Sequence, residues 1–176
     1  MNWNQLSLLL LLVVLSSHSC KEEVKNETRV PTEQELKDKL IEFNKSKVKT
    51  EEVIIDSLVQ NNYPSARTSD TGIRYIIYPV GEGKKASIED VAVIDYRINL
   101  LNGEEIYSTS DKGPEKVRIG HEDIASGLHE GLLYMLEGDS ALFIMPSHRA
   151  YGFTGEEGSI PQNAILIFHV DLIDLE

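Results

Sequence analysis

The chain has 176 residues and a formal net charge of -12 at pH 7. This acidity argues against a nucleic-acid partner, because phosphate binding needs a basic face. Its single cysteine cannot form an intramolecular disulfide, so an apolar core must hold the fold. Without the leader described next, about 155 residues are left, enough for one domain of ordinary size and an accessory segment.

The N-terminus has the pattern of an export signal. Residues 6–15 read LSLLLLLVVL, which is shorter than the ~20 residues of a transmembrane helix and typical of a signal peptide. Three serines follow just before Cys20, and lipobox peptides share this small-residue approach to a cysteine. We therefore predict a signal peptide over 1–19 and a lipid anchor on Cys20. The alternative is a secretory peptide cleaved nearby, with Cys20 as a spare thiol.

A charged linker and a helical spacer are expected next. Residues 20–30 have little apolar content and suit a tether between lipid and protein. Thr32 is a candidate helix N-cap, and Glu35 is placed to complete a capping box with it. We assign residues 31–71 to the spacer.

The spacer carries two stretches with helical periodicity. Leu36, Leu40 and Phe43 form an apolar stripe on the first, and the second runs from Thr50 to Gln60. The sequence predicts two helices here, which can pack on each other, on the main domain, or on a second copy of the chain. In the last case, residues 31–62 would form a homodimer interface.

Beyond the spacer the periodicity becomes strand-like. Asn102-Gly103 is a hairpin turn, and Gly127 to Leu136 predicts one short amphipathic helix. One helix among many antiparallel strands favours an α+β fold, with a curved sheet wrapped around the helix. The expected strands are Ile73 to Tyr78, Val91 to Ile98, Lys116 to Ile119, Ser140 to Pro146 and Ala164 to Asp174.

Motifs for common catalytic chemistry are missing. The sequence has no GxSxG nucleophile elbow, and His129-Glu130 lacks the second histidine of a zinc-protease helix. The five histidines are too scattered for a metal site. We expect no metal and no cofactor.

Residues 72–176 closely resemble the FKBP family of peptidyl-prolyl isomerases. The resemblance implies an FKBP-like half-barrel of antiparallel strands around a short helix. Six blocks carry it in the family's order: Val93-Ile94-Asp95-Tyr96 with Asn102-Gly103, Ile119-Gly120 through Ile124 to Met135, Gly138-Asp139, Ala150-Tyr151-Gly152, Ile160-Pro161, and Ile165 to Phe168.

The resemblance also implies a binding cleft for a proline-containing polypeptide. Tyr96 and Phe168 would be its walls, and Leu128 its floor. Tyr151 and Ile160 would form the rim. The Tyr151 hydroxyl and the Ile124 amide would donate hydrogen bonds to carbonyls of the bound peptide. Read without the family, each apolar residue of this set is an ordinary core residue.

Several positions depart from the family pattern. Tyr107 stands where the family has an acidic residue, and Ile106 where it has an aromatic one. Glu115 falls near a position that is aromatic in strong macrolide binders, and Glu156 where many members have histidine. An aromatic pair contact is worth about 0.5 to 1.5 kcal/mol, so we expect weak macrolide binding and slow catalysis.

Two functional hypotheses follow. The first is a lipid-anchored isomerase of the cell envelope, on the periplasmic face rather than the cell surface, that helps exported proteins fold. The second is a non-catalytic FKBP-like lipoprotein that binds a client or serves as a scaffold. The arrangement of signal, spacer and FKBP-like domain also resembles the gliding-motility-associated lipoprotein isomerases of Bacteroidota, which implies a place in that machinery.

Overall fold

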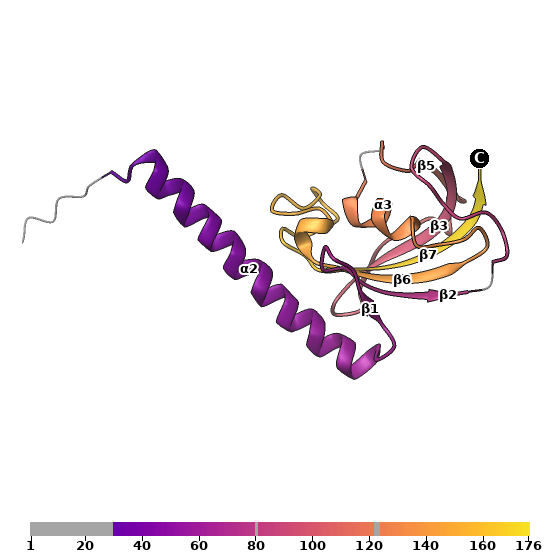
Figure 1. The fold of residues 1–176 in the computed structure, drawn as a ribbon, viewed down its shortest axis with the longest axis horizontal. Coiled ribbons are helices and arrows are strands. Elements are labelled where there is room, and N and C mark those ends of the chain that lie inside the picture. The colour runs from indigo at the N-terminus through magenta and orange to yellow at the C-terminus, as the bar shows by residue number, and fades with distance from the viewer. Residues whose placement is uncertain (1–29, 80, 122–123) are drawn as a thin grey trace, which may run out of the picture. The chain divides into compact units, whose positions relative to one another are not determined.

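A computed structural model describes residues 30–79, 81–121 and 124–176 (Figure 1). The chain divides into two compact units, Met1–Lys37 and Asp38–Glu176. The predicted signal peptide, the Cys20 anchor and nearly all of the predicted linker lie outside the described residues. Within them, no helix is both long enough and apolar enough to cross a membrane. The domain boundaries inferred from the sequence stay predictions.

The spacer forms one helix, α2, over Glu33–Asn62. Its predicted capping box is confirmed, because the Thr32 amide donates to Glu35 Oε2 at 2.8 Å and the Glu35 amide to Thr32 Oγ1 at 3.2 Å. The prediction of two helices is wrong. Residues 44–49 are polar except for Val48 and separate the two apolar stretches, but they include no glycine or proline and therefore continue the helix.

Seven strands make one antiparallel sheet in the order β1-β2-β6-β7-β3-β4, with β5 also paired to β3. The predicted α+β, FKBP-like fold with an N-terminal helix is confirmed. The two-residue strand β1 was not predicted, because it lies in a polar stretch. The strands are β1 Arg67–Thr68, β2 Arg74–Tyr78, β3 Val91–Leu100, β4 Glu105–Ser108, β5 Glu115–Arg118, β6 Ser140–Met145 and β7 Leu166–Leu175.

The central strand β6 is buried on both faces of the sheet. Phe143 belongs to the main core, together with the short helix α3 (Ser126–Leu132), which lies over that face in Figure 1. The alternate residues Leu142 and Ile144 pack in a second cluster with Ile55 of α2. Side chains alternate along a strand, so a continuous apolar run such as that of β6 exposes apolar groups on both faces of the sheet. Here α3 covers one face and α2 the other.

Glycine lets α3 lie close to the sheet. A Cβ atom at Gly131 would lie 2.7 Å from a ring carbon of Phe143, and one at Gly127 would lie 2.7 Å from Met145 Sδ. The helix is shorter than predicted, since it ends at Leu132 and the chain then turns.

A buried carboxylate joins α2 to the loop that follows β6. Glu51 is 6 % exposed and accepts hydrogen bonds from the Ser147 amide at 2.8 Å and the Ser147 hydroxyl at 2.6 Å. Lys47 Nζ lies 3.8 Å from the same carboxylate and offsets its charge. Ser147 begins the 3-10 helix η1 (Ser147–Arg149), which leads directly to Tyr151.

Replacing Glu51 is expected to destabilise the fold. In Glu51→Ala the buried Ser147 amide and hydroxyl lose their acceptor, which should lower the free energy of unfolding by about 2–3 kcal/mol. Glu51→Gln keeps an acceptor oxygen and should cost less. The neighbouring exposed residue supplies the control, Glu52→Ala, which should stay within about 0.5 kcal/mol of the parent. Urea denaturation measures all three, and equal midpoints for the two alanine variants would contradict the assignment.

Candidate functional site

A cleft of about 200 Å³ opens between β3, β4 and the loop after η1. Aromatic and branched apolar side chains form most of its wall, and the polar lining groups are the Glu156 carboxylate, the Ser159 hydroxyl and the hydroxyls of the three tyrosines. Its lining residues are Tyr96, Ile98, Ile106, Tyr107, Tyr151, Glu156, Ser159 and Ile160.

Tyr96 of β3 is the centre of an aromatic stack. Its ring lies 5.2 Å from the ring of Tyr107 and 6.4 Å from that of Phe168, with interplanar angles of 26° and 15°. The fully buried Thr109 holds the backbone at this point, because its hydroxyl accepts from the Tyr96 amide at 2.9 Å. The side chain is thus fixed both by packing and by its own main chain.

The structure brings three of the six residues predicted for the site to the cleft. Tyr96, Tyr151 and Ile160 line the cleft itself. Leu128 and Phe168 do not line it directly. They are 1 % and 0 % exposed and belong to the core that also contacts the aromatic wall.

Ile124 lies just before α3, where it is half-buried against the same core. Its predicted role is carried by its backbone amide. Among the described residues that amide has no hydrogen-bond acceptor, which is compatible with donation to a bound carbonyl.

The glycine-rich loop brings Tyr151 and Ile160 to one rim. Gly155 has a φ of +64° and donates its amide to the Tyr151 carbonyl at 3.1 Å. A Cβ atom there would lie 2.2 Å from the Ile160 carbonyl oxygen, so only glycine fits this turn. The bridge between Glu156 and Ile160 closes the loop.

Glu115 is a functional candidate that the sequence reasoning noted only as a departure. Its carboxylate accepts a hydrogen bond from the Tyr96 hydroxyl at 3.1 Å and a second from the Tyr107 hydroxyl. The three side chains come from β5, β3 and β4, and β3 pairs with both neighbours. Lys112 Nζ lies 4.9 Å from the centroid of the Tyr107 ring.

Burial and this network raise the pKa of both tyrosines. Burial raises the pKa of Tyr96 far above its ordinary value, and the charge of Glu115 raises it further. The hydrogen bond to Glu115 is the largest cause that raises the pKa of Tyr107, followed by burial. Both hydroxyls therefore remain donors around neutral pH.

The lining of the cleft suits the binding and desolvation of an apolar group, and it offers few of the usual nucleophiles. Its lining includes no cysteine, histidine or lysine, and its one serine, Ser159, lies on the exposed rim. Among the described residues, no group of three histidine, cysteine or acidic side chains is placed to hold a metal ion. The arrangement suits recognition of an apolar group flanked by peptide carbonyls.

The family of FKBP-type peptidyl-prolyl cis-trans isomerases matches residues 82–173 of the chain. The chain belongs to this family. The FKBP-type isomerase FkpA of Buchnera aphidicola (subspecies Baizongia pistaciae) is 33 % identical over 108 residues, and that of Escherichia coli K12 is 31 % identical over 108 residues. Each alignment covers 61 % of this chain, but 42 % and 39 % of those relatives. The chain therefore matches about two fifths of their length.

A solved structure supports the fold independently. The crystal structure of FkpA from Escherichia coli superposes with a TM-score of 0.61 at 22 % identity, covering 100 % of this chain and 83 % of that one. Tyr107 stands where the family resemblance implies an acidic residue, and in this structure the carboxylate that meets Tyr96 and Tyr107 is that of Glu115 on β5.

Removal of the Glu115 charge should make Tyr107 easier to ionise. In Glu115→Gln the hydrogen bond from the Tyr107 hydroxyl to a carboxylate, the largest cause that raises its pKa, is replaced by a weaker one to a neutral amide, and the negative charge is lost as well. The pKa of Tyr107 should therefore fall toward its ordinary value. Glu156→Gln is the matched control, because Glu156 acts on Tyr107 only through space and should shift it less. Ultraviolet absorbance during alkaline titration, with Tyr107→Phe to assign the transition, measures the shift. An unchanged titration in Glu115→Gln would rule out the network.

Proposed function

We propose that the chain catalyses cis-trans isomerisation of Xaa-Pro bonds in polypeptide clients and thereby assists the folding of exported envelope proteins. The observation that carries the proposal is the cleft itself, in which Tyr96, Tyr107, Ile98 and Ile160 make apolar walls beside the Tyr151 rim. Family membership supports the reaction. The predicted export signal and the predicted lipid site at Cys20 support the location.

Isomerisation of an Xaa-Pro bond requires an apolar cleft of this kind. Rotation about an Xaa-Pro bond crosses a barrier of about 18–20 kcal/mol because amide resonance is lost, yet no bond has to break. The twisted amide is less polar than the planar one, so an apolar cavity stabilises it relative to the ground state. A catalyst therefore needs a dry pocket for the proline ring and donors that hold the flanking peptide.

Each candidate residue has a role in that scheme. The ring of Tyr96 is the wall that the proline ring would contact, and the buried ring of Phe168 stacks on it and keeps it in place. Leu128 belongs to the same core. The Ile124 amide and the Tyr151 hydroxyl hold the carbonyls on either side of the rotating bond. Glu115 acts as a positioning residue, because it fixes the hydroxyl ends of two wall tyrosines.

The alternative is a non-catalytic client-binding or scaffold lipoprotein. One observation favours it: the wall residues Ile106 and Tyr107 differ from the family pattern, and the Tyr107 hydroxyl is tied to Glu115. A protease-free isomerisation assay on a panel of Xaa-Pro peptides separates the two hypotheses. Rates equal to the uncatalysed reaction in a folded sample would leave only the binding role.

Tyr151→Phe should weaken peptide binding by about 1 kcal/mol, the net worth of one hydrogen bond, which corresponds to roughly fivefold in dissociation constant. The ring remains, so the stability of the fold should change little. Tyr63→Phe serves as the control, since Tyr63 packs against the α2 side of the sheet, away from the cleft. Fluorescence titration with a proline-containing peptide gives the constants. Equal affinities for Tyr151→Phe and the parent would show that Tyr151 is not a donor to the peptide.

The location of the protein is part of the proposal. A signal peptide over 1–19 and a lipid on Cys20 would place the domain at the cell envelope, on the periplasmic face. The resemblance of the whole arrangement to gliding-motility-associated lipoprotein isomerases supports a role in that machinery, with clients among its exported components.

Cys20→Ala should convert the protein from a membrane-bound to a soluble periplasmic form, because the thiol is the only cysteine sulfur that a lipid could modify. Cell fractionation followed by immunoblotting measures the distribution. Ser19→Ala keeps a small residue before the cysteine and is the control, which should remain in the membrane fraction. Retention of Cys20→Ala in that fraction would refute the lipid anchor.

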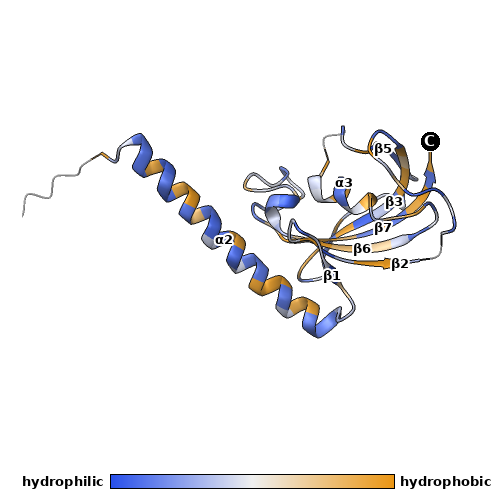
Figure 2. Ribbon diagram, in the orientation of Figure 1, coloured by the Kyte–Doolittle hydropathy of each residue, from blue (hydrophilic) through white to orange (hydrophobic). Residues whose placement is uncertain are grey.

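The homodimer through residues 31–62 also stays a proposal. Hydrophobic residues recur along α2 in Figure 2, and Leu36, Leu40 and Phe43 are 53 %, 54 % and 61 % exposed. Their spacing puts them on one helix face, as a helix pair requires. In a homodimer, this stripe would pack against the same stripe of the second copy, and both would be buried.

A further inference from the structure

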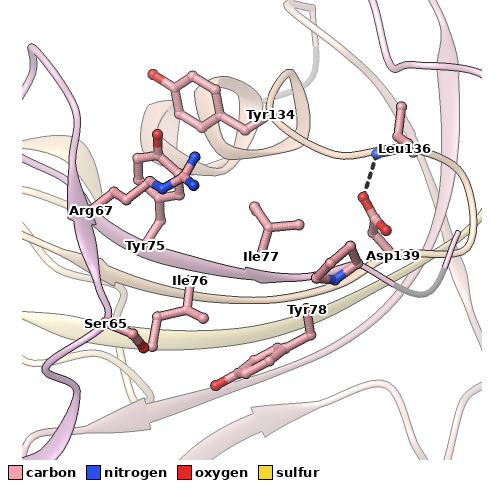
Figure 3. A pocket seen from close by; sticks show the side chains of 10 residues that line it. Ser65, Arg67, Tyr75, Ile76, Ile77, Tyr78, Tyr134, Leu136 and Asp139 are labelled. Carbon is pink, nitrogen blue, oxygen red and sulfur yellow. Dashed lines mark hydrogen bonds between the residues drawn. The ribbon is translucent and has the colours of Figure 1, made fainter.

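A second hollow lies at the other end of the sheet from the isomerase cleft. It has a volume of about 560 Å³ and is lined by the consecutive residues 75–79 of β2 and the following turn, with Arg67 and Tyr134 at its sides (Figure 3). Consecutive strand residues point to opposite faces of a sheet. A hollow that all five of them touch therefore runs along the edge of the strand, and we refer to it as the β2 groove.

The backbone of β2 is open along this groove. On one side, β2 pairs with β6 over its whole length, from Arg74 to Tyr78. On the other, β1 pairs only with Arg74 and Tyr75. The Ser69 amide donates to the Ile73 carbonyl, so the polar backbone groups of residues 73, 75 and 77 face the β1 side. Within the described residues, no strand pairs with Ile77 there.

Aromatic and apolar side chains form the wall above this edge. The ring of Tyr75 stacks on that of Tyr134 at 4.7 Å and 12°, and the Tyr134 hydroxyl is fixed by Glu130 at 2.9 Å. Figure 3 shows Ile77 pointing into the hollow on the same side as these rings, and Ile76 and Tyr78 pointing away from it on the other. An added strand would find a pocket for its alternate side chains on the Tyr134 side.

The groove carries a positive charge available to a ligand. Arg67 is exposed and, among the described residues, has no carboxylate within 4.0 Å. The other charged lining residue is Asp139, whose oxygens accept from the Gly81 amide at 3.1 Å and the Leu136 amide at 2.8 Å. The exposed cation therefore favours an acidic occupant over a basic one.

We propose that the β2 groove binds an extended, acidic segment of another polypeptide as an additional strand. Its backbone would pair with Ile77, one apolar side chain would enter the pocket beside Tyr134, and an acidic side chain would contact Arg67. Pro79 has no amide hydrogen, which limits the pairing to a short segment.

The test uses the fluorescein-labelled hexapeptide TVEVTV, with both ends blocked, and its fully N-methylated analogue. Fluorescence anisotropy with the full-length protein should show binding of the first peptide only, because N-methyl groups remove the donors that pair with the edge. Amide hydrogen exchange at Ile77 should slow when TVEVTV is bound. Equal binding of both peptides, or no binding of either, would overturn the proposal.

Charge reversal tests the part played by Arg67. Arg67→Glu should weaken TVEVTV binding roughly threefold to tenfold and favour the basic peptide TVKVTV instead. Arg118→Glu makes the same change at an exposed position on β5 and should leave both affinities unchanged. Equal losses in the two variants would show a non-specific charge effect and contradict the site. If Ile77 exchange slows with protein concentration in the absence of peptide, the occupant is a second copy and the proposal fails.

Discussion

The burial of β6 on both faces is the constraint on which the rest of the structure depends. Phe143 packs toward α3, and its neighbours Leu142 and Ile144 pack toward Ile55 of α2. Burying one such side chain contributes about 1.5–3 kcal/mol relative to leaving it exposed, so neither face can remain uncovered. The spacer helix is therefore part of the folded unit from at least Glu51 onward, because its inner face completes the second core.

This constraint extends to the candidate cleft through one loop. The last residues of β6 lead into η1, whose first residue is held by the buried Glu51. Two residues after η1, Tyr151 reaches the rim, where Gly155 turns the chain so that Ile160 faces it. The position of the rim thus depends on α2 as well as on the sheet. A family domain that lacked such a helix would have to satisfy Ser147 by other means.

Much of the fold followed from local patterns in the sequence. The alternation in 73–78, the Asn102-Gly103 turn and the capping box at Thr32 each have a local physical cause, and each is present. The continuity of α2 was missed because its polar middle resembles a linker, while its contacts come from residues far along the chain. The Glu115 network was missed for the same reason: two strands must both pair with β3 before its carboxylate meets Tyr96 and Tyr107.

The two ends of the sheet differ in how completely their outer strands are paired, and this difference bears on function. At the cleft end, β4 and β5 both pair with β3, and side chains from all three strands close the wall around Glu115. At the other end, β1 covers only the first two residues of β2 and leaves Ile77 beside an exposed cation. Open edges invite unspecific pairing and are commonly blunted by charge or proline. Pro79 limits the open edge to a short segment, because it has no amide hydrogen. Arg67 gives this segment a preference for acidic partners. The edge therefore stays open, but only to a short strand of suitable charge.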